Sequence, residues 1–161
     1  MMQISDATEA DLPDVLALNE ASLPHVSTMD MQRTSWFAAN SYYFRIARLD
    51  DLFAGFLIGL RPGIDYDSEN YRWFCDNYPD FGYVDRVAVS ASARRQGVAS
   101  RLYDDFANAL RGEVEVMTCE VNIRPPNESS MRYHEIHGFR QVASQETEGG
   151  KKMVAMMEKV L

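Results

Sequence analysis

The chain has 161 residues, 46% of them hydrophobic and 25% charged, which suits one globular domain with a substantial core. Its net charge of −8 argues against a nucleic-acid-binding face, which is usually basic, and is compatible with a cationic substrate. The sequence has no apolar run near the ~20 residues that span a bilayer, no signal-peptide pattern, no disulfide scaffold and no Cys or His cluster with metal-binding spacing. We therefore expect a single cytoplasmic domain over residues 1–161, without metal, membrane or nucleic acid.

The first sixty residues predict two helices and a β-hairpin. Thr8-Glu9-Ala10-Asp11 has the pattern of a capping box, so a helix is expected to begin there and to run to about Ala21. A second helix is expected over about 29–40. Alternating and apolar runs predict strands: an edge strand over 2–6, and a hairpin of strands over 42–48 and 52–60.

Residues 61–80 form a long connection that is rich in aromatic and carboxylate side chains. A connection of this length in a small domain is usually functional or mobile. Two interpretations remain open, namely a loop that binds substrate and an insertion that packs on the surface.

The stretch between residues 82 and 110 predicts a strand, a tight turn and a helix. Residues 82–89 have the apolar character of a buried strand, and a helical pattern begins at Gly97. The first amides of a helix lack partners within the helix and lie at its positive end, so they can bind a phosphate or pyrophosphate. Gly97 permits close backbone approach, and Arg94 and Arg95 add positive charge. An ordinary strand-to-helix turn has the same pattern.

The C-terminal part predicts a strand, a helix and a second β-hairpin. A strand over about 113–121 is expected to end at a break over 122–126, which contains two prolines. Asn127, Ser130 and Tyr133 are three residues apart and lie roughly along one face of the next helix. Gly138 is placed to end this helix. The last hairpin is expected to comprise a strand beginning over 139–144, a polar turn over 146–152, and a strand over 153–159.

Two of these segments resemble the cofactor-binding motifs of the GNAT superfamily of acyl-CoA-dependent N-acyltransferases. Arg94, Gly97 and Ala99 fill the pyrophosphate-loop pattern of that family, and Asn127, Ser130 and Tyr133, followed by Gly138-Phe139, resemble its second cofactor segment. The resemblance is close over residues 83–140. It implies an α/β (α+β) fold with a mixed, mostly antiparallel sheet and helices on both faces. Two central parallel strands, here 82–89 and 113–121, would splay apart to admit acetyl-CoA.

The resemblance also implies the residues that bind the acetyl-CoA. Backbone groups of the strand and the loop amides would hold the pantetheine arm and the pyrophosphate, and the helix would line the cofactor cleft. The expected cofactor-binding residues are Val87, Ala88, Val89, Arg94, Arg95, Gln96, Gly97, Val98, Ala99, Ser100, Asn127, Ser130 and Tyr133.

The catalytic candidates are one general acid and two alternative general bases. By resemblance, Tyr133 would protonate the leaving thiolate. Asp85 shares a strand face with Val87 and Val89, and Glu120 lies on the facing strand, so either could take the proton of the amine. Other family members place the carboxylate two residues earlier, where this chain has Tyr83. Asp85 could instead pair with Arg86 or another arginine, and water alone could act as the base.

Substrate selection is expected from the first two helices and from residues 61–80. Carboxylates beside aromatic rings suit an ammonium group by charge and cation–π contact, although each such residue, taken singly, is more readily a surface or packing residue. The candidate wall residues are Glu20, His25, Asp65, Tyr66 and Trp73.

The function implied is direct transfer of an acetyl group from acetyl-CoA to a primary amine of a small molecule or peptide. Homodimers are common among proteins of this type. Two alternatives remain: a non-catalytic acyl-CoA-binding regulatory domain of the same fold, and an acyltransferase that uses a longer acyl group.

Overall fold

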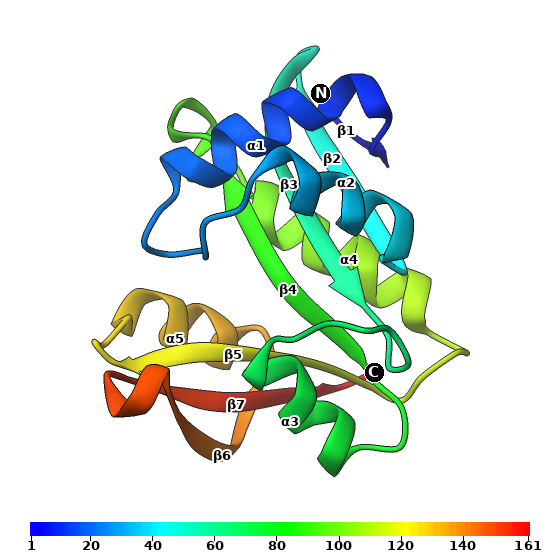
Figure 1. Ribbon diagram of the computed structural model, residues 1–161. Coiled ribbons are helices and arrows are strands. Elements are labelled where there is room, and N and C mark those ends of the chain that lie inside the picture. The colour runs from blue at the N-terminus through cyan, green and yellow to red at the C-terminus, as the bar shows by residue number, and fades with distance from the viewer. The chain divides into compact units, whose positions relative to one another are not determined.

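The computed structural model describes all residues from 1 to 161, and its strands form one seven-stranded mixed sheet in the order β1-β2-β3-β4-β5-β7-β6 (Figure 1). β4 and β5 pair in parallel, whereas β1–β2, β2–β3, β5–β7 and β6–β7 pair antiparallel. This topology confirms the predicted mixed, mostly antiparallel sheet. The strands are β1 (Met2–Asp6), β2 (Tyr43–Leu49), β3 (Leu52–Leu60), β4 (Gly82–Val89), β5 (Val116–Arg124), β6 (Arg140–Thr147) and β7 (Lys152–Val160).

Five α-helices and three short 3₁₀ turns connect the strands. The helices are α1 (Leu12–Ala21), α2 (Met31–Asn40), α3 (Glu69–Asn77), α4 (Val98–Leu110) and α5 (Glu128–Ile136), and the turns are η1 (Glu9–Asp11), η2 (Ala91–Ala93) and η3 (Glu148–Gly150). None of these helices combines the length and the apolar character needed to cross a membrane. The predicted capping box is confirmed, because the backbone N–H of Thr8 donates to the carboxylate of Asp11 at 2.8 Å.

The chain divides into two compact units, of which the first comprises Met1–Leu60 and Val84–Ala109. In this unit α1 and α2 cover one face of the strands, and α4 covers the other (Figure 1). Contact between β3 and α4 is close, because a Cβ placed on Gly59 would lie 2.7 Å from Cε1 of Phe106. A Cβ on Gly55 would lie 2.6 Å from the carbonyl oxygen of Ala88. Both positions therefore need glycine because other groups approach them closely.

The second unit comprises Arg61–Tyr83 and Leu110–Leu161. Its helices α3 and α5 cover opposite faces of β7, as two contacts show. Tyr78, which follows α3, donates from its hydroxyl to Glu158, whereas a Cβ on Gly138, which follows α5, would lie 3.6 Å from Cε of Lys159. Glu158 and Lys159 are successive residues of one strand and therefore point to opposite faces. β4 is shared, since Gly82 and Tyr83 belong to the second unit and the rest of the strand to the first.

Two predicted features of the fold need correction. Residues 61–80 contain a helix, α3, which begins where Ser68 caps the N–H of Tyr71 and which buries Tyr71 and Phe74. These buried rings favour the packed-insertion interpretation of the segment. The expected break over 122–126 is wrong in its first part, because β5 continues to Arg124 with a register shift between Asn122 and Arg124.

Candidate functional site

The loop before α4 has a backbone conformation suited to an anion. Arg95 and Gly97 both adopt positive φ, at 64° and 78°, so the chain turns sharply between η2 and the first turn of the helix. Residues 94–97 are exposed, and a Cβ on Gly97 would meet nothing within 4 Å. Conformation rather than crowding therefore explains the glycine, since a side chain disfavours positive φ.

The N-terminus of α4 follows this loop directly. The backbone N–H of Arg101 donates to the carbonyl of Gly97 at 3.0 Å, which begins the hydrogen-bond ladder of the helix. The amides of Val98 and Ala99 precede that ladder and lie at the positive end of the helix dipole. Together with the charges of Arg94 and Arg95, this arrangement fits a phosphate or pyrophosphate group. The sequence-predicted loop residues 94–100 thus form one continuous local element.

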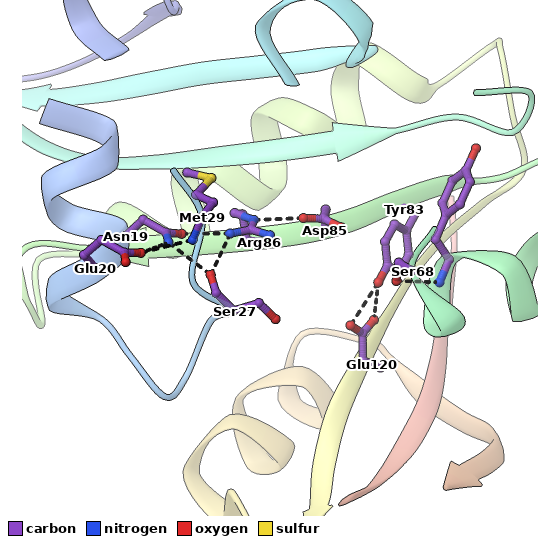
Figure 2. Close-up of polar contacts among 10 residues, drawn as sticks. Asn19, Glu20, Ser27, Met29, Ser68, Tyr83, Asp85, Arg86 and Glu120 are labelled. Carbon is purple, nitrogen blue, oxygen red and sulfur yellow. Dashed lines mark hydrogen bonds and ion pairs between the residues drawn. The ribbon is translucent and has the colours of Figure 1, made fainter. Parts of the chain in front are cut away.

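The strand that leads into this loop carries a buried ion pair. Nε of Arg86 donates to the carboxylate of Asp85 at 2.9 Å, and the two side chains are only 6% and 4% exposed. The guanidinium also donates from Nη1 to Oδ1 of Asn19 at 3.0 Å and to the carbonyl of Ser27 at 2.9 Å (Figure 2). Asp85 therefore has the arginine partner that was considered as the alternative to its role as a base.

The connection between α1 and α2 is tied to α1 by Glu20. Its carboxylate accepts from the hydroxyl of Thr28 at 2.6 Å, from Nδ2 of Asn19 at 2.8 Å and from the backbone N–H of Met29 at 3.2 Å. These bonds, that from Thr28 foremost, hold the pKa of Glu20 below its usual value. Glu20, expected to contact substrate, thus has a structural role in this connection, and His25 lies exposed within the same connection.

In the second unit, Tyr83 and Glu120 form the most evident polar pair beside aromatic side chains. The hydroxyl of Tyr83 donates to the carboxylate of Glu120, with distances of 2.7 and 2.9 Å to its two oxygens (Figure 2). The ring of Tyr83 lies against Tyr71 and Phe74, with centroid distances of 5.8 and 5.5 Å. Tyr83 is buried and Glu120 is partly exposed.

The remaining substrate candidates lie in or beside α3. Tyr66 packs its ring on Tyr71 at 5.5 Å, and Trp73 packs edge-on against Phe74 at 5.1 Å. Asp65 is exposed. Tyr66 and Trp73 therefore take part in the aromatic packing of α3, which sequence reasoning had considered as the alternative.

α5 carries the candidate acid and His134, and His137 follows its last residue. Tyr133 stacks on His137, with ring centroids 4.1 Å apart and an angle of 25° between the planes. His137 Nδ1–H donates to the carbonyl of Tyr133 at 2.8 Å, and His134 Nδ1–H donates to that of Ser130 at 2.7 Å. Burial lowers the pKa of His134, so its neutral form is favoured. The spacing of four residues between Tyr133 and His137 could have revealed this stack in the sequence.

Asn127 has a structural role at the start of α5. Its side-chain oxygen accepts from the backbone N–H of Ser130 at 3.3 Å, and it therefore caps the helix. The three predicted cofactor residues of this segment accordingly lie on the cap and the first two turns of one helix. The structure contains no group of three or more His, Cys, Asp or Glu side chains arranged to hold a metal ion.

Comparisons with known proteins agree with this arrangement of elements. Residues 12–139 match the family model described as Acetyltransferase (GNAT) family. A comparison with curated protein sequences gave no match.

Among solved structures, the chain is similar to the ribosomal-protein-S18-alanine N-acetyltransferase of Escherichia coli, with a TM-score of 0.75, 16% identity, and coverage of 99% of this chain and 94% of that one. It is also similar to the ribosomal-protein-alanine N-acetyltransferase of Brucella melitensis, with a TM-score of 0.72, 22% identity and 99% of both chains covered. A third similar structure is Arabidopsis thaliana Naa50 in complex with the bisubstrate analogue CoA-Ac-MVNAL, with a TM-score of 0.75, 14% identity and 99% of both chains covered. At these identities the likeness is one of fold.

Proposed function

Because the chain belongs to the GNAT acetyltransferase family, we propose that it is an acetyl-CoA-dependent N-acetyltransferase that acts directly on a primary amine of a small molecule or peptide. We treat residues 1–161 as one such domain and place it in the cytoplasm. The observation that carries the proposal is the loop at residues 94–97, whose two left-handed residues lead into the N-terminus of α4. This loop fits the pyrophosphate of a coenzyme A thioester.

Each part of the first unit would have a distinct task in this reaction. The amides of residues 95–100 would hold the pyrophosphate, and the backbone of Val87, Ala88 and Val89 would pair with the pantetheine arm. The thioester supplies an activated acetyl group when it is bound. A backbone amide directed at its carbonyl oxygen would stabilise the negative charge that develops there.

Proton transfer would fall to the side chain of Tyr133 and to that of a carboxylate. The hydroxyl of Tyr133 would protonate the leaving thiolate, and its stack on His137 restricts the orientation of the ring. Glu120 is the better of the two candidate bases. Protonation of Asp85 would leave the buried guanidinium of Arg86 without its counter-ion, whereas Glu120 accepts from the neutral hydroxyl of Tyr83.

The acceptor is proposed only as a class, a primary amine. Neutral amine is the attacking form, and a partly exposed carboxylate beside aromatic rings, as at Glu120, suits an incoming ammonium group. The Arabidopsis neighbour is bound to a peptide conjugate, which makes peptides with a free amino terminus a reasonable first choice of acceptor.

A thiol-release assay with acetyl-CoA tests this function directly. The panel should contain small primary amines and short peptides with free amino termini, and acetyl-CoA binding should be measured separately by calorimetry. We expect binding together with turnover of at least one amine. Absence of both would refute the proposal, whereas binding without turnover of any amine would favour the non-catalytic acyl-CoA-binding domain.

A further inference from the structure

Arg86 is a buried cation that contacts three consecutive parts of the first unit. It donates to Asn19 of α1 and to the carbonyl of Ser27 in the connection that follows, and its guanidinium lies 5.0 Å from the ring centroid of Phe37 in α2. Its charge is compensated by Asp85, its neighbour on β4. One side chain of the central strand thus contacts α1, α2 and their connection, and Figure 2 shows its hydrogen bonds to Asn19 and Ser27.

The connection from Ser22 to Asp30 is held mainly by polar contacts. Leu23, Pro24 and His25 are exposed, and Met29 is buried near the end of the connection. Asn19 is shared between the two anchors, because its Oδ1 accepts from Arg86 while its Nδ2 donates to Glu20 and to the carbonyl of Ser27. Loss of the guanidinium would therefore remove one of the two hydrogen bonds to the carbonyl of Ser27, and also the hydrogen bond that Arg86 donates to Oδ1 of Asn19.

The same strand continues into the residues proposed to bind the acyl donor. Val87, Ala88 and Val89 follow Arg86 directly, and η2 and the loop at 94–97 follow them. A fixed geometry between donor and acceptor is a large part of acyl-transfer catalysis. Arg86 is therefore in a position to fix α1, α2 and their connection with respect to the strand proposed to bind the acyl donor.

We propose that Arg86 is a positioning residue that holds the connection Ser22–Asp30 on β4 and thereby sets the affinity for the amine acceptor. The proposal rests on the proposed function and on the expectation from the sequence that the first two helices, with His25 in their connection, take part in substrate selection. The planar fork of arginine is required, because lysine cannot donate to Asp85, Asn19 and Ser27 in the same fixed geometry.

Hydrogen exchange tests the structural half of the proposal without any substrate. Variants R86K and R86M are compared with the wild type and with R45K. Arg45 is a suitable control, since it lies on β2 of the same unit and pairs with Asp6 and Asp105. We expect amide exchange over residues 22–30 to accelerate about tenfold or more in R86M, less in R86K, and not in R45K. Equal exchange in R86M and R45K would overturn the proposal.

Steady-state kinetics test the functional half with the amine that gives the highest turnover in the thiol-release panel. For R86K, which retains the charge and is the safer variant to fold, we expect the KM for the amine to rise about tenfold while the KM for acetyl-CoA stays within about twofold. Parallel rises in both KM values, or no rise in either, would refute a positioning role. If no amine reacts, the proposed function fails, whereas the exchange result still decides whether Arg86 holds the connection.

Discussion

Replacing Tyr78 with phenylalanine tests the polar network that attaches the end of α3 to the sheet. The hydroxyl of Tyr78 donates to Oε1 of Glu158, while Arg140 donates to Oε2 from Nε at 3.1 Å and from Nη2 at 2.8 Å. The side chain of Glu158 is 12% exposed and that of Arg140 is 74% exposed. The hydrogen bond from Tyr78 is therefore better shielded from water than the ion pair with Arg140.

This difference in exposure ranks the two contacts. A hydrogen bond to a charged, largely buried acceptor contributes about 1.5–3 kcal/mol to the free energy of unfolding, whereas an exposed ion pair contributes about 0.2–1 kcal/mol. We expect Y78F to lose an amount in the first range and R140Q an amount in the second. The phenylalanine ring retains the packing against Phe74 and Phe81, at centroid distances of 5.8 and 6.3 Å, so the loss reports on the hydroxyl.

The stabilisation should also depend on pH. The hydrogen bond from Tyr78 is the largest influence on Glu158 and, with Arg140, holds its pKa below the ordinary 4.5 despite burial. When the pKa of a carboxyl group is lower in the folded state, its contribution to stability is complete above the pKa of the unfolded state. This contribution is lost as the pH falls through the pKa of the folded state. The difference between wild type and Y78F should therefore be constant from about pH 7 down to about pH 5 and should shrink below about pH 4.

Urea denaturation followed by circular dichroism measures these differences. At this chain length, each kcal/mol also corresponds to about 2–4 °C in Tm, which gives an independent check. A loss in Y78F smaller than that in R140Q, or a difference that does not change with pH, would refute the reasoning from exposure and charge.

Three further predictions concern other parts of the molecule. Y133F should lower kcat about 10²- to 10⁴-fold with little change in acetyl-CoA affinity, and unchanged turnover in the thiol-release assay would remove Tyr133 as the acid. G59A should destabilise the protein by about 1–3 kcal/mol in urea because the added methyl group meets Phe106, and F106L in the same chain should restore most of the loss; the absence of any rescue would contradict this cause. Burial lowers the folded-state pKa of His134, so its contribution to the free energy of unfolding is complete above about pH 6.5 and is lost as the pH falls below that value. H134F should therefore flatten the decrease in Tm between about pH 7 and pH 5, and parallel pH profiles of Tm for the variant and the wild type would contradict this prediction.

Most of the fold could be predicted from periodicity and local signals. The capping box at Thr8 and the apolar runs of β3 and β4 are local features, and the structure confirms them. The helix α3 was missed because the many aromatic and carboxylate side chains of residues 61–80 indicated a loop. The serine at position 68, which caps the helix, was not used as a sign of a helix start. β5 was predicted three residues too early, over 113–121, because Pro125 was taken to end the strand before Asn122. A residue before proline favours the extended conformation, and Arg124 adopts it.

In the candidate site too, local features could be predicted from the sequence, whereas contacts between distant residues could not. The loop at residues 94–97 could be predicted, because Gly97 itself encodes the left-handed turn. Contacts between distant residues could not be assigned, since residue type alone does not specify a partner. Arg86 and Ser27 are 59 residues apart in sequence, and Tyr83 and Glu120 are 37 apart. The one available signal for Arg86 was that two charged residues, Asp85 and Arg86, stand together in the middle of a mainly apolar strand.

The left-handed backbone of Arg95 has a consequence for engineering this protein. A residue with a Cβ loses about 1–2 kcal/mol in that conformation relative to glycine, and Arg95 lies in an exposed loop where its side chain gains little from packing. Laboratory selection for heat resistance alone should therefore replace Arg95 by glycine early. Selection that also requires ligand binding should retain the arginine. The two selections should therefore yield different residues at position 95.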